Sequence, residues 1–173
     1  MPLSGVVSGL VRLGKVTELV ALGPDDLEAL LALEEAQPIP VSMPTTLARA
    51  LASSRHQVFG AVDEYGRILG YALLAIQAFD GELEAVLVAA DARRQGIAGR
   101  LLAQVISTAR ERQLERLLLE VRAGNNAAIV LYRAAGFAQD GIRKGYYPPA
   151  PDSVEREDAC LMSLDLDSSA RNG

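Results

Sequence analysis

The stretch DARRQGIAGRLLAQVISTAR, residues 91–110, decides the fold of this chain. A basic loop containing glycine leads directly into a segment with apolar residues every three or four positions, which predicts an amphipathic helix over residues 97–112. Apolar segments flank this unit at residues 82–88 and 116–121. A strand, a helix and a second strand in this order predict two parallel strands joined by a right-handed crossover.

The other segments predict a sheet around this unit. Residues 57–62 and 68–76 read as an antiparallel hairpin closed by DEYGR. GPDD at residues 23–26 starts a helix, prolines then make a loop, and Thr45 or Thr46 is expected to cap a short helix that ends at Ala52. Further strands are expected at residues 16–22, 137–142 and 159–166, and a further helix at residues 126–135.

The predicted fold class is therefore α/β. A single, mostly antiparallel mixed sheet with a central parallel pair is flanked by about four helices, in one domain over residues 16–166. We expect residues 1–15 to be a flexible extension and residues 167–173 a frayed tail.

The amino-acid composition disfavours several classes of function. The chain has 173 residues, half of them apolar, and a formal net charge of −5, which disfavours nucleic-acid phosphates and suits a cationic partner. The single cysteine, Cys160, lies in an apolar run and is expected in the core, while the single histidine, His56, lacks neighbours at metal-ligand spacing. With no long apolar run and no well-formed signal peptide, we expect a cytoplasmic protein that uses no metal and no membrane.

The loop before the 97–112 helix has the chemistry of a phosphate site. A helix start offers unpaired backbone N–H groups and a partial positive charge, and Gly96 lets a ligand approach the backbone. Arg93, Arg94 and Arg100 add formal charge, so the loop predicts a pyrophosphate cradle. A solvated basic loop is the alternative, and the spacing fits neither a triphosphate loop nor a dinucleotide fingerprint.

R-R-Q-G-I-A resembles the acyl-CoA loop of the GNAT superfamily of N-acetyltransferases, Q/R-x-x-G-x-G/A, at Arg93, Gly96 and Ala98. LLLEVRAGNNAAIVLYRAAGF at residues 117–137, then IRKGYYP and EREDACLMSLDL, resemble the RimI-type branch, the ribosomal-protein-alanine N-acetyltransferases. The resemblance implies the GNAT fold and acetyl-CoA as co-substrate. Its implied acceptor is a peptide N-terminus beginning with alanine, on a basic ribosomal protein.

The resemblance also implies site residues. Glu120 would be the general base and Tyr132 the group beside the departing sulfur, with Tyr146 and Tyr147 on the peptide side. The positions that would contact the co-substrate are Val86, Leu87, Val88, Arg93, Arg94, Gln95, Gly96, Ile97, Ala98, Gly99 and Asn125.

Each assignment has a structural alternative. Glu120 could pair with Arg122 or Arg116, and Tyr132 could be core packing. Asn125 could be a helix cap, compatible with a contact to the co-substrate. The two tyrosines could end a strand in a turn.

Two departures from the branch are Gly145, where a polar residue such as asparagine is usual, and the long PPAPDSVERED segment, whose Glu155, Glu157 and Asp158 could attract a cationic peptide. Alternative functions are acetylation of a protein lysine or small amine, and non-catalytic sensing of acyl-CoA.

Overall fold

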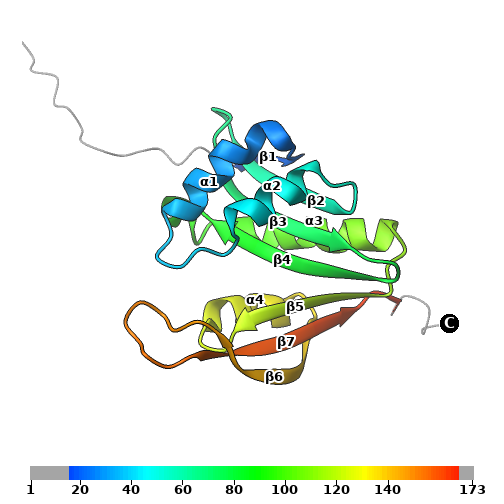
Figure 1. Ribbon diagram of the computed structural model, residues 1–173. Helices are drawn as coiled ribbons and strands as arrows, with labels where there is room; N and C mark the ends of the chain where they lie inside the picture. Colours follow the sequence, from blue (N-terminus) through cyan, green and yellow to red (C-terminus); the bar gives the residue numbers. More distant parts are fainter. Residues whose placement is uncertain (1–15, 168–173) are drawn as a thin grey trace, which may run out of the picture.

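A mixed sheet organises residues 16–167, the part of the chain that the computed structural model describes (Figure 1). Its spatial order is β1-β2-β3-β4-β5-β7-β6, with every neighbouring pair antiparallel except β4 and β5. The predicted fold class and parallel pair are confirmed. The strands are β1 (Val16–Ala21), β2 (His56–Asp63), β3 (Ile68–Ile76), β4 (Asp80–Val88), β5 (Arg116–Arg122), β6 (Ala138–Tyr147) and β7 (Glu157–Asp165).

Helices cover both faces of this sheet. The helices α1 and α2 lie on one face and α3 on the other, with α4 beside β5 (Figure 1). The predicted apolar stripe of α3 is buried, because a 3.6-residue repeat turns one face of a helix toward the sheet. The helices are α1 (Leu27–Glu35), α2 (Pro44–Ala52), α3 (Ile97–Glu111) and α4 (Asn126–Ala134), with short 3-10 turns at Pro24–Asp26 and Ala90–Ala92. Cys160 is buried in the core, as expected.

Two local predictions were wrong. Neither Thr45 nor Thr46 caps α2, because the helix already begins at Pro44, with Met43 as its extended N-cap residue. Proline at the first helical position needs no N–H partner and has a φ suited to the helix. Strand β6 also runs to Tyr147, beyond the predicted end at residue 142, so Tyr146 and Tyr147 belong to the end of a strand.

The parallel strands β4 and β5 separate soon after they begin. They pair only through Asp80–Arg116, Gly81–Leu117 and Glu82–Leu118. The two strands then diverge in the direction of their carboxyl ends (Figure 1). The later residues of β4 and β5 therefore face each other without a shared ladder, which leaves backbone hydrogen-bonding groups on both edges for another partner.

Residues 1–15 and 168–173 lie outside the described part of the chain, and with them the predicted extension and most of the predicted tail.

Candidate active site

Glu120 lies on β5 where β4 and β5 have separated, with its side chain 26% exposed. Leu119 and Val121 point to the buried face of the strand, so alternation turns Glu120 to the opposite face. Its carboxylate Oε1 is 3.3 Å from Arg143 Nη1 of β6. Arg122 and Arg116 pair elsewhere, with Glu157 and Asp80, so neither proposed structural partner holds Glu120.

Two tyrosines at the end of β6 complete the surroundings of Glu120. A side-chain hydrogen bond with Glu120 raises the pKa of Tyr146, whose ring also lies 4.9 Å from the Arg143 guanidinium carbon. Tyr147 packs against Tyr146 edge to face, with ring centroids 5.0 Å apart. Burial, followed by the charge of Glu120, raises the pKa of Tyr147 to about 12.

Tyr132, on α4, lies near Tyr147 and therefore beside the same group of side chains. Its ring packs on Phe137 at 5.8 Å, so the predicted packing role is present. No described residue forms a hydrogen bond with its hydroxyl, although only 8% of the residue is exposed. Burial, followed by the nearby Tyr147, raises the pKa of Tyr132 to about 12. The hydroxyl therefore stays protonated at neutral pH and is available as a donor.

Asp158 and Arg156 hold the backbone of β6 at Gly145, just before these tyrosines, and we call this set of hydrogen bonds the Gly145 clamp. Gly145 has φ +60°, in the left-handed region, and its N–H donates to Asp158 Oδ1 at 2.8 Å. Arg156 donates to the carbonyls of Gly145 and Tyr146 at 2.7 and 3.0 Å. Asparagine and glycine both tolerate this backbone region, so the departure at Gly145 keeps the turn of the chain.

The acidic residues of the β6–β7 segment are mostly used inside the protein. Glu157 accepts from Arg122 at 2.9 Å and from the Gly124 N–H at 3.0 Å, and Asp158 holds Gly145. Of the three predicted to attract a peptide, Glu155 is the one with an exposed side chain.

The β4–α3 loop has the backbone of an anion site. Arg94 has φ +62° and Gly96 has φ +76°, and such left-handed residues turn successive N–H groups into a concave nest. Gly96 is the N-cap residue of α3 and no side chain caps this helix start. The N–H groups of the first turn, Ile97 to Gly99, are therefore available.

The side chains of this loop differ in whether they contact the rest of the protein. Arg94 and Gln95 are exposed. Arg93 is engaged: its Nη2 donates to Gln37 Oε1 at 2.6 Å and its Nε to the Val88 carbonyl at 3.4 Å. It thereby ties the loop to the end of α1.

Asn125 is the N-cap of α4, since its side-chain oxygen accepts from the Ala128 N–H at 3.2 Å. This confirms the capping role. Val86, Leu87 and Val88 form the last part of β4 beyond its pairing with β5. A cavity of about 440 Å³ lies between α3 and α4. Its lining residues are Gly99, Leu102, Ala103, Ile106, Arg110, Leu131, Ala134 and Ala135.

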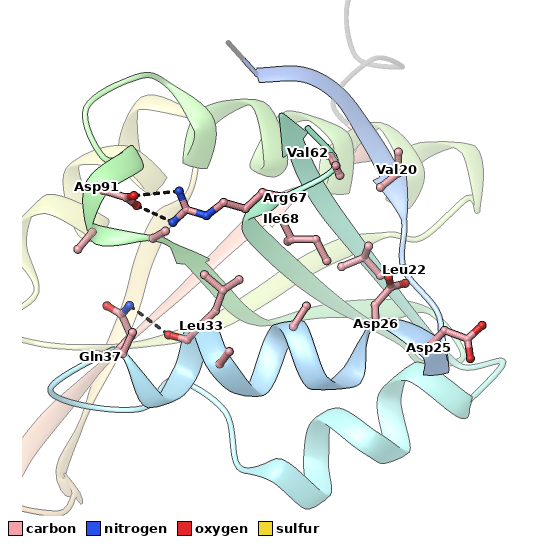
Figure 2. Close-up of a pocket in the computed structure, with 16 residues that line it drawn as sticks. Val20, Leu22, Asp25, Asp26, Leu33, Gln37, Val62, Arg67, Ile68 and Asp91 are labelled. Atoms are coloured by element: carbon pink, nitrogen blue, oxygen red, sulfur yellow. Dashed lines mark hydrogen bonds and ion pairs between the residues drawn. The ribbon is translucent and has the colours of Figure 1, made fainter. Parts of the chain in front are cut away.

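A larger cavity, of about 780 Å³, lies elsewhere, between α1 and the strands β1 to β3 (Figure 2). Arg67 and Asp91 form a two-bond ion pair at its edge, at 2.9 and 3.0 Å. None of the predicted site residues lines this cavity. The larger cavity is therefore separate from the predicted site residues.

Arg143 and the Gly145 clamp were missed in the sequence. Arg143 meets Glu120 only because β7 lies between their strands, with Leu161 opposite both Glu120 and Gly141. That register joins residues more than 20 positions apart, and no local pattern encodes it. Among residues 16–167 no group of three or more His, Cys, Asp or Glu side chains suits a metal ion. No helix in the same region is long and apolar enough to cross a membrane.

The fold and the opened parallel pair define an acyltransferase of the acetyltransferase (GNAT) type, and the model of that family matches residues 25–137. The chain belongs to the acetyltransferase (GNAT) family, which confirms the resemblance seen in the sequence.

Relatives within the family resemble this chain over different lengths. The N-alpha-acetyltransferase RimI of Mycobacterium tuberculosis is 33% identical over 90% of this chain and 92% of its own. The [Ribosomal protein bS18]-alanine N-acetyltransferase of Escherichia coli is 37% identical over 58% of this chain, a match that spans 66% of the relative. The crystal structure of the Escherichia coli ribosomal-protein-S18-alanine N-acetyltransferase superposes with a TM-score of 0.80 and 30% identity, covering 90% of this chain and 97% of that one.

Proposed function

We propose that this protein is a cytoplasmic N-alpha-acetyltransferase. It moves the acetyl group of acetyl-CoA to the N-terminal amine of a protein, with alanine first and a basic ribosomal protein as the acceptor. The observation that carries the proposal is the meeting of Glu120, Tyr132, Tyr146 and Tyr147 where β4 and β5 separate. The functions for which these relatives are named support the choice of acceptor.

Acetyl-CoA would lie along the open edge of β4. The backbone of Val86 to Val88 would pair with the amide groups of its arm, and the nest from Arg94 to Gly99 would hold the pyrophosphate. Asn125 would contact the arm from the start of α4. Arg93 would contribute through its backbone, because Gln37 and Val88 engage its side chain.

Glu120 would accept a proton from the acceptor amine, directly or through a water. An α-amine has a pKa near 7.8, so removing its proton at pH 7 costs about 1.1 kcal/mol, against about 4.6 kcal/mol for a lysine amine near 10.4. The free-energy cost of deprotonation that one carboxylate must help to meet is therefore lower for an N-terminal acceptor than for a lysine. The amine would then attack the thioester directly in a ternary complex.

Tyr132 would donate a hydrogen bond to the sulfur as it gains charge. Since its pKa is raised to about 12 and a thiol has a pKa near 8.5, complete proton transfer to a free thiolate would be uphill by about 5 kcal/mol. Stabilisation of the developing charge is therefore its main contribution. Tyr146 and Tyr147 would flank the peptide, where tyrosine offers contact area with a polar tip.

The test is mass spectrometry of a peptide panel incubated with acetyl-CoA and the enzyme. The panel holds an alanine-first basic peptide, its N-terminally blocked form with an internal lysine, and free polyamines. We expect acetyl on the α-nitrogen of the first peptide only. Acetyl on the blocked peptide or the polyamines would favour the lysine or small-amine alternative, and CoA binding without any transfer would favour a sensor.

Glu120→Gln separates chemistry from binding in the same assay. We expect kcat to fall by about 10²–10³ near pH 7, typical of losing a general base, with acetyl-CoA affinity unchanged. The matched control is Glu115→Gln, an exposed glutamate just before the same strand. An unchanged rate in Glu120→Gln would remove Glu120 from the mechanism.

A further inference from the structure

Three consecutive residues just before the Arg94–Gly99 nest are anchored by partners from elsewhere in the chain. Asp91 accepts two hydrogen bonds from the Arg67 guanidinium of the β2–β3 turn, at 2.9 and 3.0 Å. Ala92 is fully buried in the core. The next residue, Arg93, donates from Nη2 to Gln37 Oε1 at 2.6 Å. The β4–α3 segment is therefore held from the sheet, the core and the end of α1 in turn.

Both outside partners are themselves fixed. The backbone N–H of Arg67 donates to Asp63 Oδ1 at 2.9 Å, within the β2–β3 turn. The side-chain amide of Gln37 donates to the Leu33 carbonyl of α1 at 3.2 Å, as Figure 2 shows. Asp91 and Arg93 are therefore bonded to groups that have a defined place in the fold.

Arg94, which follows the anchored residues, has a backbone that needs such support. Its φ of +62° is unfavourable for a residue with a Cβ atom. Such a conformation persists where the surrounding structure holds it. Among the described residues, none forms a side-chain hydrogen bond with Arg94, Gln95 or Gly96. The support must therefore come from the residues that flank the nest.

Packing is weak behind the start of this segment. The cavity of about 780 Å³ reaches Ala89, Ala90 and Asp91, and the Arg67 side chain extends along its edge to Asp91 (Figure 2). Atoms beside a cavity lack the neighbours that close packing would supply. On this side the Arg67–Asp91 ion pair and the Gln37–Arg93 hydrogen bond therefore take the place of packing.

We propose that Arg67 and Gln37 are positioning residues for acetyl-CoA. They hold Asp91 and Arg93, and through them they keep the nest in its anion-binding shape before the pyrophosphate arrives. Neither side chain needs to touch the ligand. A preformed nest loses less conformational entropy on binding, so its affinity is higher. The inference rests on the proposed function, because it concerns the same nest.

Isothermal calorimetry with acetyl-CoA separates positioning from a simple effect of charge. Arg67→Gln and Asp91→Asn each break the ion pair, so we expect either change to raise Kd about two- to fivefold. The variant with both changes should be no weaker than the single ones, since only one pair is lost. If the two charges acted only through their field, Asp91→Asn would instead strengthen binding of the anion. Unchanged or tighter binding in Asp91→Asn would overturn the role of the pair.

Gln37→Ala tests the second contact in the same assay. It releases the Arg93 guanidinium, which would improve affinity if charge near the ligand were decisive. Loss of position predicts the opposite, a Kd higher on the order of fivefold. Together with Arg67→Gln the effects should multiply to about 10- to 25-fold, since the two contacts hold different residues. Equal or tighter binding in Gln37→Ala would remove Gln37 from the proposal. Arg49→Gln, exposed on α2, is the control and should bind like wild type.

Steady-state kinetics distinguish positioning from a general loss of structure. The same variants should raise the KM for acetyl-CoA by these factors, with kcat and the KM for the peptide within twofold of wild type. A fall in kcat at saturating acetyl-CoA, with its KM unchanged, would overturn the inference. If wild type binds acetyl-CoA but acetylates no peptide, the proposed function fails on its own and calorimetry still decides the inference.

Backbone ¹⁵N order parameters test the preformed nest without any ligand. We expect values of about 0.85 for the amides of Arg94 to Gly96 in wild type, falling toward about 0.6 in the double variant Arg67→Gln/Gln37→Ala. Arg49→Gln should keep the wild-type values. A nest that is equally ordered in the double variant, or already disordered in wild type, would overturn the inference whatever the enzyme transfers.

Discussion

The Glu120 carboxylate forms an ion pair with Arg143 and accepts a hydrogen bond from the Tyr146 hydroxyl, and both partners lie on β6. On the proposed function, a cationic acceptor would displace the Arg143 guanidinium before its amine reached Glu120. The side chain of Arg143 is 53% exposed, so this ion pair contributes little energy and can open. On the proposed function, the Arg143 guanidinium therefore occupies the place that the acceptor's ammonium group would take.

Replacing Arg143 with Gln should lower the KM for a basic peptide. The competing pair is worth at most about 1 kcal/mol, so we expect a decrease of up to about fivefold at low salt, with kcat within twofold of wild type. Steady-state kinetics at 20 and 200 mM salt measure it. Arg133→Gln, an exposed arginine of α4, is the control, and a KM that rises in Arg143→Gln would show that Arg143 holds the peptide.

The raised pKa of Tyr132 predicts how the enzyme responds to alkaline pH. A free tyrosine ionises near pH 10, but Tyr132 has a pKa of about 12, so the donor survives at pH 10. We expect kcat to stay level between pH 8 and 10.

Tyr132→Phe should lower kcat at all of these pH values by about 10- to 100-fold, in line with loss of one donor to developing charge. The KM for acetyl-CoA should stay within threefold. Tyr65→Phe, in an exposed turn, is the control. A decline of wild-type kcat centred near pH 10 would contradict this picture.

No side chain caps the start of α3. Gly96 adopts φ +76° at the N-cap, and an added Cβ would meet no protein atom within 4 Å. The left-handed backbone conformation therefore disfavours a side chain at this position, whereas the protein atoms around it leave space for one. On the proposed function, this helix end would receive the pyrophosphate of acetyl-CoA.

Gly96→Ala should weaken acetyl-CoA binding on the order of tenfold and destabilise the protein by about 1–2 kcal/mol, because a left-handed backbone strains an alanine. Isothermal calorimetry and urea unfolding measure the two effects. Gly23→Ala is the control, since Gly23 has φ −130° and open space around it. Unchanged affinity in Gly96→Ala would argue against the cradle.

The segment between α1 and α2 is fixed by one buried carboxylate. Glu34 accepts from the N–H groups of Val41 and Ser42 at 2.7 and 3.1 Å, and from the hydroxyl of Tyr71. Glu34→Gln turns an N–H₂ group toward these donors, so we expect a loss of about 2 kcal/mol in the free energy of unfolding. Urea unfolding checks this, with exposed Glu35→Gln as the control; equal stabilities would contradict the role of Glu34.

Most elements could be predicted because their signals are local. The stripe of α3 and the turn at residues 63–67 lie in the sequence next to what they determine. The end of β6 depends on Asp158 and Arg156 holding Gly145 across the strand pair. Likewise Glu120 has a recognisable motif, whereas Arg143 lies beside it only through the register of two strand pairs.

Across the whole molecule, buried tyrosines make stability depend on alkaline pH. Burial raises the pKa of Tyr71 and of Tyr132 above the value of about 10 expected in the unfolded chain. Their contribution is complete below pH 10 and is lost above it, because the unfolded chain ionises first. We expect the free energy of unfolding to fall by up to about 1.4 kcal/mol per pH unit for each, measured by urea unfolding between pH 9 and 11. A flat profile would contradict this.

The short ladder between β4 and β5 gives the protein two half-sheets joined by a seam of three residue pairs and the ion pair of Arg116 with Asp80. On the proposed binding mode, the arm of acetyl-CoA would lie in the gap as a missing strand and continue that seam. Amide hydrogens along the free edges of Val86–Val88 and of the end of β5 should therefore exchange quickly in the protein alone and slowly after acetyl-CoA is added. On this proposal, acetyl-CoA binding would complete the backbone hydrogen bonding of the sheet.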